Sequence, residues 1–441
     1  MITERKDITS ICSNISIDQL NGHLKFAERD TTILAEKYGT PLYLIDEEYI
    51  RKMCRVYREA MVEAFDSYSR PLFASKSLCF KKIYPIIEVE GLGADVASIG
   101  ELFTALESGF NPKNLMFHGN NKTDDDIQFA ISHKVGCIVC DNREELEVID
   151  RIAGENDTKQ RILIRVTPGI DPHTHAKINT GRVDSKFGAA IETHQAEDLT
   201  SFALSLKNID LMGFHCHIGS QIFEFEPFAD AAKIMLKFIA DIKNTLGYSA
   251  RYLNLGGGMG VRYTHEHPEI DYRENILEIG KVVKSEAKRH GIKPPHIFME
   301  PGRSIVAAAG MTLYTVGAIK IIEGFRNYVS INGGMADNPR YTLYSSPYSV
   351  ALANKADDIA DFKCTVAGRC CESGDLIQED VMLPRPVRGD ILAVATTGAY
   401  NYSMASNYNR LTRPPIVVLT KDSEYVAVER ETLADLLAKD N

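Results

Sequence analysis

No apolar run in the 441-residue sequence approaches the roughly 20 residues that a membrane-spanning helix needs. The N-terminal stretch MITERKDITSICSNISID also lacks the apolar core of a signal peptide. The sequence has 50 Lys and Arg against 60 Asp and Glu, which gives a net charge of −10, and it contains no basic stripe. These absences argue against a membrane protein and against a nucleic-acid-binding surface, and they predict a cytoplasmic protein.

Nine cysteines are present, but they do not form the pattern of a disulfide framework. Their number is odd and they are scattered along the chain, which suits a reducing compartment. The one CxxC motif, Cys137 to Cys140, lies in the apolar run VGCIVCD, which has the pattern of a β-strand. We therefore interpret this pair as two core cysteines.

Short apolar runs alternate with longer helix-like segments from about residue 41 to residue 305. The helical segments carry apolar residues at helical spacing, and three of them are expected to end at Gly109, Gly154 and Gly247. Strand–helix alternation predicts a parallel sheet, and eight repeats predict a closed (β/α)₈ barrel. The eight apolar runs are residues 71–75, 93–98, 114–119, 136–141, 161–166, 210–219, 251–258 and 296–302.

Beyond residue 310 the pattern changes to short β-rich segments separated by turn residues, such as YVSINGG and DILAVATTG. The first 40 residues do not fit the barrel repeat either, and the length suits two domains. We predict an α/β protein with a TIM-type barrel at residues 41–305. Residues 1–40 and 306–441 are predicted to form a β-sandwich or β-barrel-like domain.

Polar, ionisable or glycine residues follow all eight apolar runs at the same end. In barrels of this kind the active site lies at the C-terminal ends of the strands, so we expect these residues to surround one site. They include Lys76, Asp95, His118, Asp141, Arg165, His215, His217, Gly256, Gly257, Gly258 and Glu300.

Three of these features together indicate a phosphorylated aldehyde cofactor. A lysine can form an imine, successive glycines can expose backbone N–H groups to a phosphate, and a carboxylate can keep a pyridine nitrogen protonated. Each feature alone has an ordinary alternative, because Lys76 could be a solvated lysine, Gly256–Gly258 a plain loop and Glu300 an ordinary acid.

Several motifs resemble the diaminopimelate decarboxylase branch of the pyridoxal-phosphate (PLP) decarboxylases, which have the alanine-racemase type of fold. They occur in the order of that family over about residues 38–411. The motifs are FASK (73–76), HGNNKT (118–123), HAKINTGRVDSKFG (175–188), GFHCHIGSQ (213–221), NLGGGMG (254–260), EPGR (300–303), MADNPRYTLY (335–344), CESGD (371–375) and GAYNYSMASNYN (398–409). The resemblance implies PLP-dependent decarboxylation of meso-diaminopimelate to L-lysine, the last step of lysine biosynthesis.

The resemblance also implies how PLP is held. Lys76 is expected to be the Schiff-base lysine, His217 to stack on the cofactor ring and Glu300 to pair with the pyridinium nitrogen. Asp95 and Arg165 are expected to support them. The phosphate is expected to lie against Ser220, Gly256, Gly257, Gly258 and Tyr400.

The residues implied for the substrate lie later in the chain. Arg303, Arg340, Tyr344 and Tyr400 are expected to bind its distal end, Glu372 its distal amine, and Tyr408 to line the site. Cys371 is expected to donate a proton near Cα. Two spare arginines favour diaminopimelate over ornithine, lysine or arginine, because a guanidinium binds a carboxylate in a bidentate manner. A decarboxylase or racemase of such a related amino acid remains the alternative.

The family resemblance further implies a homodimer, in which Cys371 and Glu372 reach the active site of the partner chain. A non-catalytic cofactor-binding protein of the same fold would lack these two residues. The chain differs from the family pattern at Phe73, Asn332 and Tyr341, which bears on fine substrate preference.

We predict no metal centre. Three histidine pairs share a face at strand spacing, but clustered acids do not accompany them in the sequence. These pairs are His173 with His175, His215 with His217, and His265 with His267.

Overall fold

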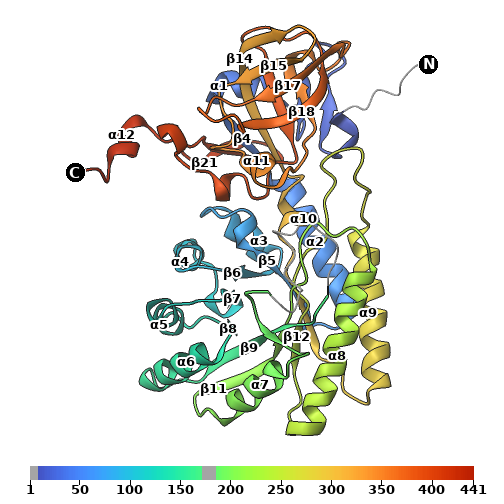
Figure 1. Cartoon of the computed structure of the whole chain (residues 1–441), viewed down its shortest axis with the longest axis vertical. Coiled ribbons are helices and arrows are strands. Elements are labelled where there is room, and N and C mark those ends of the chain that lie inside the picture. Colours follow the sequence, from blue (N-terminus) through green and yellow to red (C-terminus); the bar gives the residue numbers. More distant parts are fainter. Residues whose placement is uncertain (1–7, 171–184) are drawn as a thin grey trace. The chain divides into compact units, whose positions relative to one another are not determined.

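The computed structural model describes residues 8–170 and 185–441 (Figure 1). Two compact units divide the chain. One comprises Arg51–Gly260 and Ile270–Gly302, and the other comprises Met1–Ile50, Val261–Glu269 and Arg303–Asn441. His173 and His175, with most of the motif at 175–188, lie outside the described residues.

The first unit is a closed barrel of eight parallel strands, which confirms the predicted fold class. The chain of parallel pairings runs β9-β11-β12-β13-β5-β6-β7-β8 and returns from β8 to β9. Each of the eight predicted apolar runs overlaps one barrel strand. Strands that are buried on both faces have continuous apolar sequences, which is why the runs located them. The strands are β5 (Arg70–Ala74), β6 (Gly93–Val96), β7 (Leu115–Phe117), β8 (Cys137–Cys140), β9 (Gln160–Thr167), β11 (Ile209–His215), β12 (Tyr252–Asn254) and β13 (His296–Met299). A short β10 (Ala189–Ala190) pairs with β9.

Helices lie outside the barrel strands, as Figure 1 shows. Side-chain caps define where several of them begin. Ser98 accepts from the backbone of Glu101 at the start of α4, and Thr123 forms a reciprocal capping box with Asp126 at α5. The helices are α2 (Glu47–Ala64), α3 (Ile83–Val89), α4 (Ile99–Glu107), α5 (Asp124–Ser132), α6 (Arg143–Glu155), α7 (Gln195–Ser205), α8 (Glu226–Leu246) and α9 (Tyr272–Arg289).

One predicted helix stop, Gly154, lies one residue before the observed end of the helix. Helix α8 ends at Gly247 in the left-handed conformation, as expected, but Gly154 lies inside α6. The helix instead ends at Glu155 and is capped by Asn156, whose backbone N–H and side-chain amide both donate to Ile152 O. A Cβ at Gly154 would lie 2.7 Å from the side-chain nitrogen of Asn208, so a larger residue there would require that side chain to move.

The barrel interior is filled by side chains from its strands. Cys137 belongs to this buried cluster, together with Leu72, Met116, Val139, Leu163, Met212 and Phe298. Cys140 is also fully buried, and all nine cysteines are free thiols. The interpretation of the CxxC pair as core cysteines is therefore confirmed.

The second unit consists mostly of β-sheet. Its large sheet follows the order β18-β17-β15-β14-β4-β20-β21, with β16 and β19 attached through β14. Its strands are β4 (Leu42–Asp46), β14 (Gly310–Ile322), β15 (Arg326–Ile331), β16 (Val350–Leu352), β17 (Phe362–Ala367), β18 (Leu376–Leu383), β19 (Ile391–Ala395), β20 (Ile416–Leu419) and β21 (Glu424–Val428). A small antiparallel sheet contains β1 (Ile15–Ile17), β2 (Leu24–Phe26) and β3 (Arg29–Asp30).

Strand β4 falls inside the range predicted for the barrel, yet it pairs with β14 and β20. All five of its residues are buried, so its apolar sequence resembles a barrel strand and gives no indication of its partners. The helices of this unit are short: α1 (Thr31–Tyr38), α10 (Arg303–Val306), α11 (Arg340–Tyr344) and α12 (Leu433–Leu437). Within the described part of the chain, no helix combines the length and apolarity that a membrane span requires.

Candidate active site

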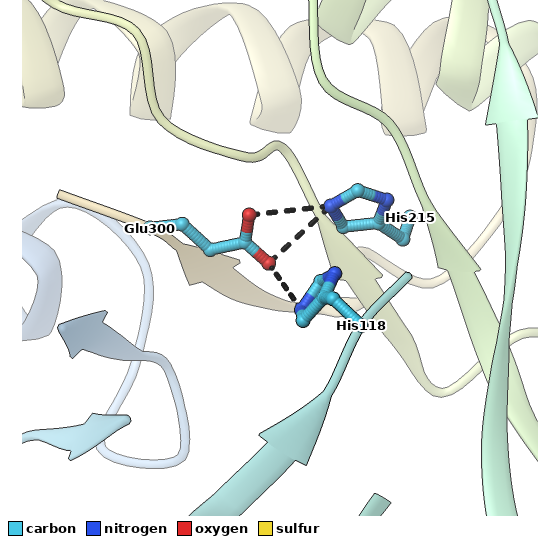
Figure 2. A group of neighbouring side chains, drawn as sticks. All are labelled: His118, His215 and Glu300. Atoms are coloured by element: carbon cyan, nitrogen blue, oxygen red, sulfur yellow. Dashed lines mark hydrogen bonds and ion pairs between the residues drawn. The ribbon is translucent and has the colours of Figure 1, made fainter. Parts of the chain in front are cut away.

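A buried carboxylate lies at the C-terminal end of the barrel strands. Glu300 directly follows β13 and is 6% exposed. Its Oε1 lies 3.0 Å from Nε2 of His118, which follows β7, and both carboxylate oxygens lie 3.3 Å from Nε2 of His215, the last residue of β11. Figure 2 shows the two imidazoles approaching the carboxylate from different strands. The side chain of Asn254, the last residue of β12, donates to Oε1 at 2.6 Å.

The two carboxyl groups near these histidines, Glu300 and Asp95, have pKa values shifted in opposite directions. Burial alone would raise the pKa of Glu300, but its contacts with His118 and His215 outweigh burial and hold that pKa well below its usual range. Asp95 in β6 lies 3.8 Å from Nε2 of His118, and burial raises its pKa although the His118 charge opposes the rise. Burial also lowers the pKa of His215 to about 4. Glu300 is thus the ionised carboxylate of the site.

The glycine loop after β12 is folded tightly against neighbouring strand ends. Gly256 has φ of +70°, its N–H donates to Asn254 Oδ1 at 2.9 Å, and its carbonyl accepts from the Glu300 backbone at 2.8 Å. A Cβ at Gly257 would lie 2.1 Å from the Glu300 carbonyl oxygen, and one at Gly258 would lie 2.4 Å from Gly219 O. Only glycine fits here, and the resulting bare backbone is the kind of surface that approaches a phosphate closely.

Lys76 lies in a short 3₁₀ turn, Ser75–Ser77, immediately after β5. Its neighbours Ser75 and Ser77 are buried, whereas the Lys76 side chain is exposed. Its ammonium charge acts on barrel groups: it opposes the rise that burial causes in the pKa of Asp95 and, after the larger effect of burial, lowers the pKa of His217. The turn therefore places a primary amine within electrostatic range of the residues around Glu300.

His217 and Arg165 complete the predicted barrel residues. His217 Nδ1 accepts from the Gly257 N–H at 3.3 Å, which ties the residue to the glycine loop. Arg165 in β9 stacks its guanidinium on the Phe187 ring at 4.2 Å, and burial lowers its pKa. Ser220 lies in the segment that meets the glycine loop, since Ile222 N donates to Gly258 O at 3.0 Å.

The barrel residues also fit the cofactor that the sequence suggests. The structure provides a primary amine after β5, a loop in which no side chain can stand at Gly257, and a buried ionised carboxylate at Glu300. These are the groups that an aldehyde, a phosphate and a protonated ring nitrogen require.

The predicted substrate residues of the β-rich unit form a second group. The Tyr400 ring lies near two buried guanidinium groups, 4.7 Å from that of Arg303 and 5.3 Å from that of Arg340. Arg303 also donates to Tyr263 OH at 2.8 Å, and Arg340 lies over the Tyr344 ring at 4.9 Å. Among the described residues, the buried Nε of Arg340 has no hydrogen-bond partner and Arg340 forms no ion pair with a carboxylate.

Cys371 and Glu372 lie in an exposed loop of the same unit. The loop is anchored by Asp375, which accepts from the backbone N–H groups of Met335 and Cys370, both at 2.6 Å. The Cys371 N–H donates to the Asn409 side chain at 2.7 Å. Tyr408, in the adjoining segment, is 41% exposed.

The three departures from the family pattern have structural partners of their own. Phe73 is fully buried in β5. Asn332 donates to Thr40 and accepts from the Thr315 backbone, and Tyr341 donates to Glu379 at 2.6 Å.

Sequence reasoning placed His118 and His215 among the residues that follow the strands but gave them no role, and it did not single out Asn254. Their only sequence feature was their position at or just after strand ends, which many residues share. The histidine pairs considered for a metal have separate partners, because His215 faces Glu300 whereas His217 contacts the glycine loop. Among the described residues, His118, His215 and Glu300 have ligand atoms within 4.8 Å of one another.

Comparison with known proteins identifies the family to which this barrel belongs. The family model described as "Pyridoxal-dependent decarboxylase, pyridoxal binding domain" matches residues 48–307. The fold and the barrel residues thus define a PLP-dependent decarboxylase.

Individual relatives of the chain identify the family within this class of decarboxylases. The chain is 42% identical over 420 residues to the diaminopimelate decarboxylase of Bacillus subtilis (strain 168), covering 95% of both chains. It is 44% identical over 410 residues to that of Bacillus methanolicus, covering 93% of this chain and 95% of the relative. The solved diaminopimelate decarboxylase of M. jannaschii in complex with L-lysine superposes with a TM-score of 0.90 at 32% identity, covering 97% and 98% of the two chains. The chain belongs to the diaminopimelate decarboxylase family.

Proposed function

We propose that the chain decarboxylates meso-diaminopimelate to L-lysine and CO₂ with PLP as cofactor. The relatives at 42% and 44% identity carry the name of this activity, and the M. jannaschii relative was solved with L-lysine. The observation that carries the substrate choice is the pair of buried guanidinium groups on the Tyr400 ring. A buried cation without a carboxylate partner is costly, and a carboxylate of the substrate satisfies Arg340.

PLP, when bound, supplies an electron sink for the electron pair that remains on Cα as CO₂ leaves. Lys76 provides the amine for covalent attachment, and Glu300 provides the ionised carboxylate that keeps the ring nitrogen protonated. His217 covers the ring, with Asp95 and Arg165 in support. Gly256–Gly258, Ser220 and Tyr400 hold the phosphate.

The remaining residues orient the substrate. Arg303 and Arg340 bind the distal carboxylate together with Tyr344 and Tyr400, because planar guanidinium groups match carboxylates in a bidentate manner. Glu372 binds the distal amine, and Tyr408 lines the site. Cys371 donates the proton that replaces CO₂ at Cα. Holding the distal end fixes which bond at Cα is broken, because orientation is the main contribution of such groups.

The proposal includes a homodimer in which Cys371 and Glu372 act in the site of the partner chain. The exposure of both residues in the described chain supports this arrangement, and a two-fold interface would create two equivalent composite sites. A mixture of inactive Lys76→Ala and Cys371→Ala proteins tests it. After subunit exchange, about a quarter of all sites should be free of both changes and active. Exchange without recovered turnover would rule out shared sites.

A cytoplasmic location remains a prediction.

Substrate specificity is tested by measuring CO₂ release from separate reactions with meso-diaminopimelate, ornithine, lysine and arginine. We expect release from meso-diaminopimelate and L-lysine as its product, with little release from the three amino acids that lack a distal carboxylate. Faster release from ornithine, lysine or arginine would show that the arginine pair does not select a carboxylate.

A further inference from the structure

His118 and His215 contact the carboxylate of Glu300 but have no role in the proposed reaction so far. Their rings meet edge to face with centroids 4.9 Å apart, and each presents Nε2 to Glu300 (Figure 2). His118 follows β7, whereas His215 ends β11, so the barrel brings the carboxylate between two separate strands. Both histidines are buried, at 6% and 1% exposure.

The protonation of His215 follows from its surroundings. Because burial lowers its pKa to about 4, the ring is neutral near pH 7 and carries one proton. Nε2 faces both oxygens of Glu300 at 3.3 Å, whereas the buried Nδ1 has no hydrogen-bond partner in the described residues. The favoured tautomer therefore carries its proton on Nε2 and donates to Glu300, since an unpaired buried N–H costs free energy.

His118 contacts two carboxyl groups with a single nitrogen. Its Nε2 lies 3.0 Å from Glu300 and 3.8 Å from Asp95. The pKa of Glu300 is held low, while burial raises that of Asp95, so the imidazole lies between an ionised carboxylate and one that holds its proton more readily. Asn254 fixes the orientation of Glu300 by donating at 2.6 Å, and the Gly256 N–H fixes Asn254 in turn.

Other charged groups act on the same carboxyl pair from further elements. Arg165 in β9 and the Lys76 ammonium after β5 favour its ionised forms. Neither replaces the histidines, because His118 and His215 account for the largest of the effects that lower the pKa of Glu300. Glu101 at the start of α4, whose burial raises its pKa to about 7, and Asp141 after β8 add further titratable groups at the strand ends.

We propose that His118 and His215 are positioning residues that hold Glu300 oriented and ionised, so that it keeps the nitrogen of the bound cofactor ring protonated. This inference rests on the proposed function, since it assigns Glu300 to the ring nitrogen. The histidines act through Glu300 and contact neither the reacting bond nor the substrate. A carboxylate that receives two imidazole contacts and one amide hydrogen bond has few orientations left, which is what preorganised electrostatic support requires.

The test compares apolar and hydrogen-bonding replacements at both positions. His118→Leu and His215→Leu remove the Nε2 contact, whereas His118→Gln and His215→Gln keep a donor near that position. His133→Gln is the matched control, since His133 is exposed at the end of α5. Each PLP-loaded protein is titrated with pH while the visible absorbance of the bound cofactor is followed. The cofactor Kd and kcat are measured alongside.

In the Leu variants, we expect the absorbance of the ring-protonated cofactor to be lost at a pH about one unit or more below that of the unchanged protein. We also expect kcat to fall about 10- to 100-fold, as for the loss of a hydrogen bond to a charged group. The Gln variants should recover most of both effects, and the His133→Gln protein should match the unchanged chain. In a Glu300→Gln background, the Leu changes should have almost no further effect on the absorbance titration, because residues that act through one partner are non-additive.

Three results would overturn the inference. One is an unchanged absorbance titration in His118→Leu and His215→Leu proteins that remain folded. Another is full additivity of these changes with Glu300→Gln. The third is a stoichiometric metal ion in the purified protein that is lost in the His118→Leu variant, because the three side chains would then form a metal site. The absorbance titration needs no turnover, so a protein that binds PLP as expected but releases no CO₂ would refute the proposed function alone.

Discussion

Replacing Lys122 is the single substitution in the barrel that we expect to lower the free energy of unfolding most. Its ammonium lies 2.7 Å from Glu145 in α6, and the two side chains are 2% and 3% exposed. It also donates to the carbonyl groups of Gly119 at 2.7 Å and Val139 at 2.9 Å. The residue therefore joins the segment that follows His118 to strand β8 and helix α6.

Changing Lys122 to Met leaves the Glu145 carboxylate buried without its cation. Removing one partner of a buried ion pair typically costs about 3–5 kcal/mol, and we expect a loss of unfolding free energy in that range. Burial raises the pKa of Glu145, and the Lys122 charge opposes this rise. Without Lys122 the pKa rises further, so the carboxyl is protonated at low pH. The loss of stability should therefore be smallest in acid and grow as the pH rises through the new pKa.

The measurement is urea unfolding followed by far-ultraviolet circular dichroism at pH 5 and pH 8. Lys237→Met is the matched control, because Lys237 also pairs with a carboxylate at 2.7 Å, but on a surface where the side chains are 65% and 55% exposed. Its cost should stay below about 0.5 kcal/mol. The double change Lys122→Met with Glu145→Leu should recover much of the loss, since it removes the stranded charge. A Lys122→Met protein as stable at pH 8 as the Lys237→Met protein would refute this reasoning.

Further predictions concern the cofactor and the substrate. Lys76→Ala should abolish the visible absorbance of covalently bound cofactor and all turnover, and a borohydride-reducible adduct at another lysine would contradict that role. Gly257→Ala should cost about 1–3 kcal/mol or more of stability and weaken PLP binding, because its Cβ would lie 2.1 Å from Glu300 O. Gly100→Ala, whose Cβ meets nothing closer than 3.7 Å, serves as control in the same thermal unfolding and Kd measurements. Arg340→Ala should lower kcat/KM for meso-diaminopimelate roughly 10- to 150-fold, which corresponds to a loss of about 1.5–3 kcal/mol, and should leave the cofactor Kd unchanged. If kcat/KM equals that of the unchanged protein, Arg340 lies outside the substrate site.

The sequence by itself determined the barrel and the ends of its strands. Strands that are buried on both faces have short continuous apolar runs, and eight such runs between helical segments leave few other folds. Because parallel strands end at one face, the residues after the runs could be grouped into one site before any contact was known. The motifs around Lys76, Gly256–Gly258 and Glu300 then identified the cofactor class, since each supplies a group that PLP needs.

The tertiary structure alone decided which groups meet and which of them carry a charge. Strand β4 has the apolar sequence of a barrel strand, yet it joins the other sheet because strand pairing depends on partners far along the chain. The two histidines at Glu300, and the lysine at Glu145, are likewise set by distances of 2.7–3.3 Å between side chains from different elements. The spacing of apolar residues in the sequence indicates which face of its own strand or helix a side chain occupies. It does not indicate which residue of another element that side chain contacts. Ionisation depends on this partner and on burial, and both are set only in the assembled barrel.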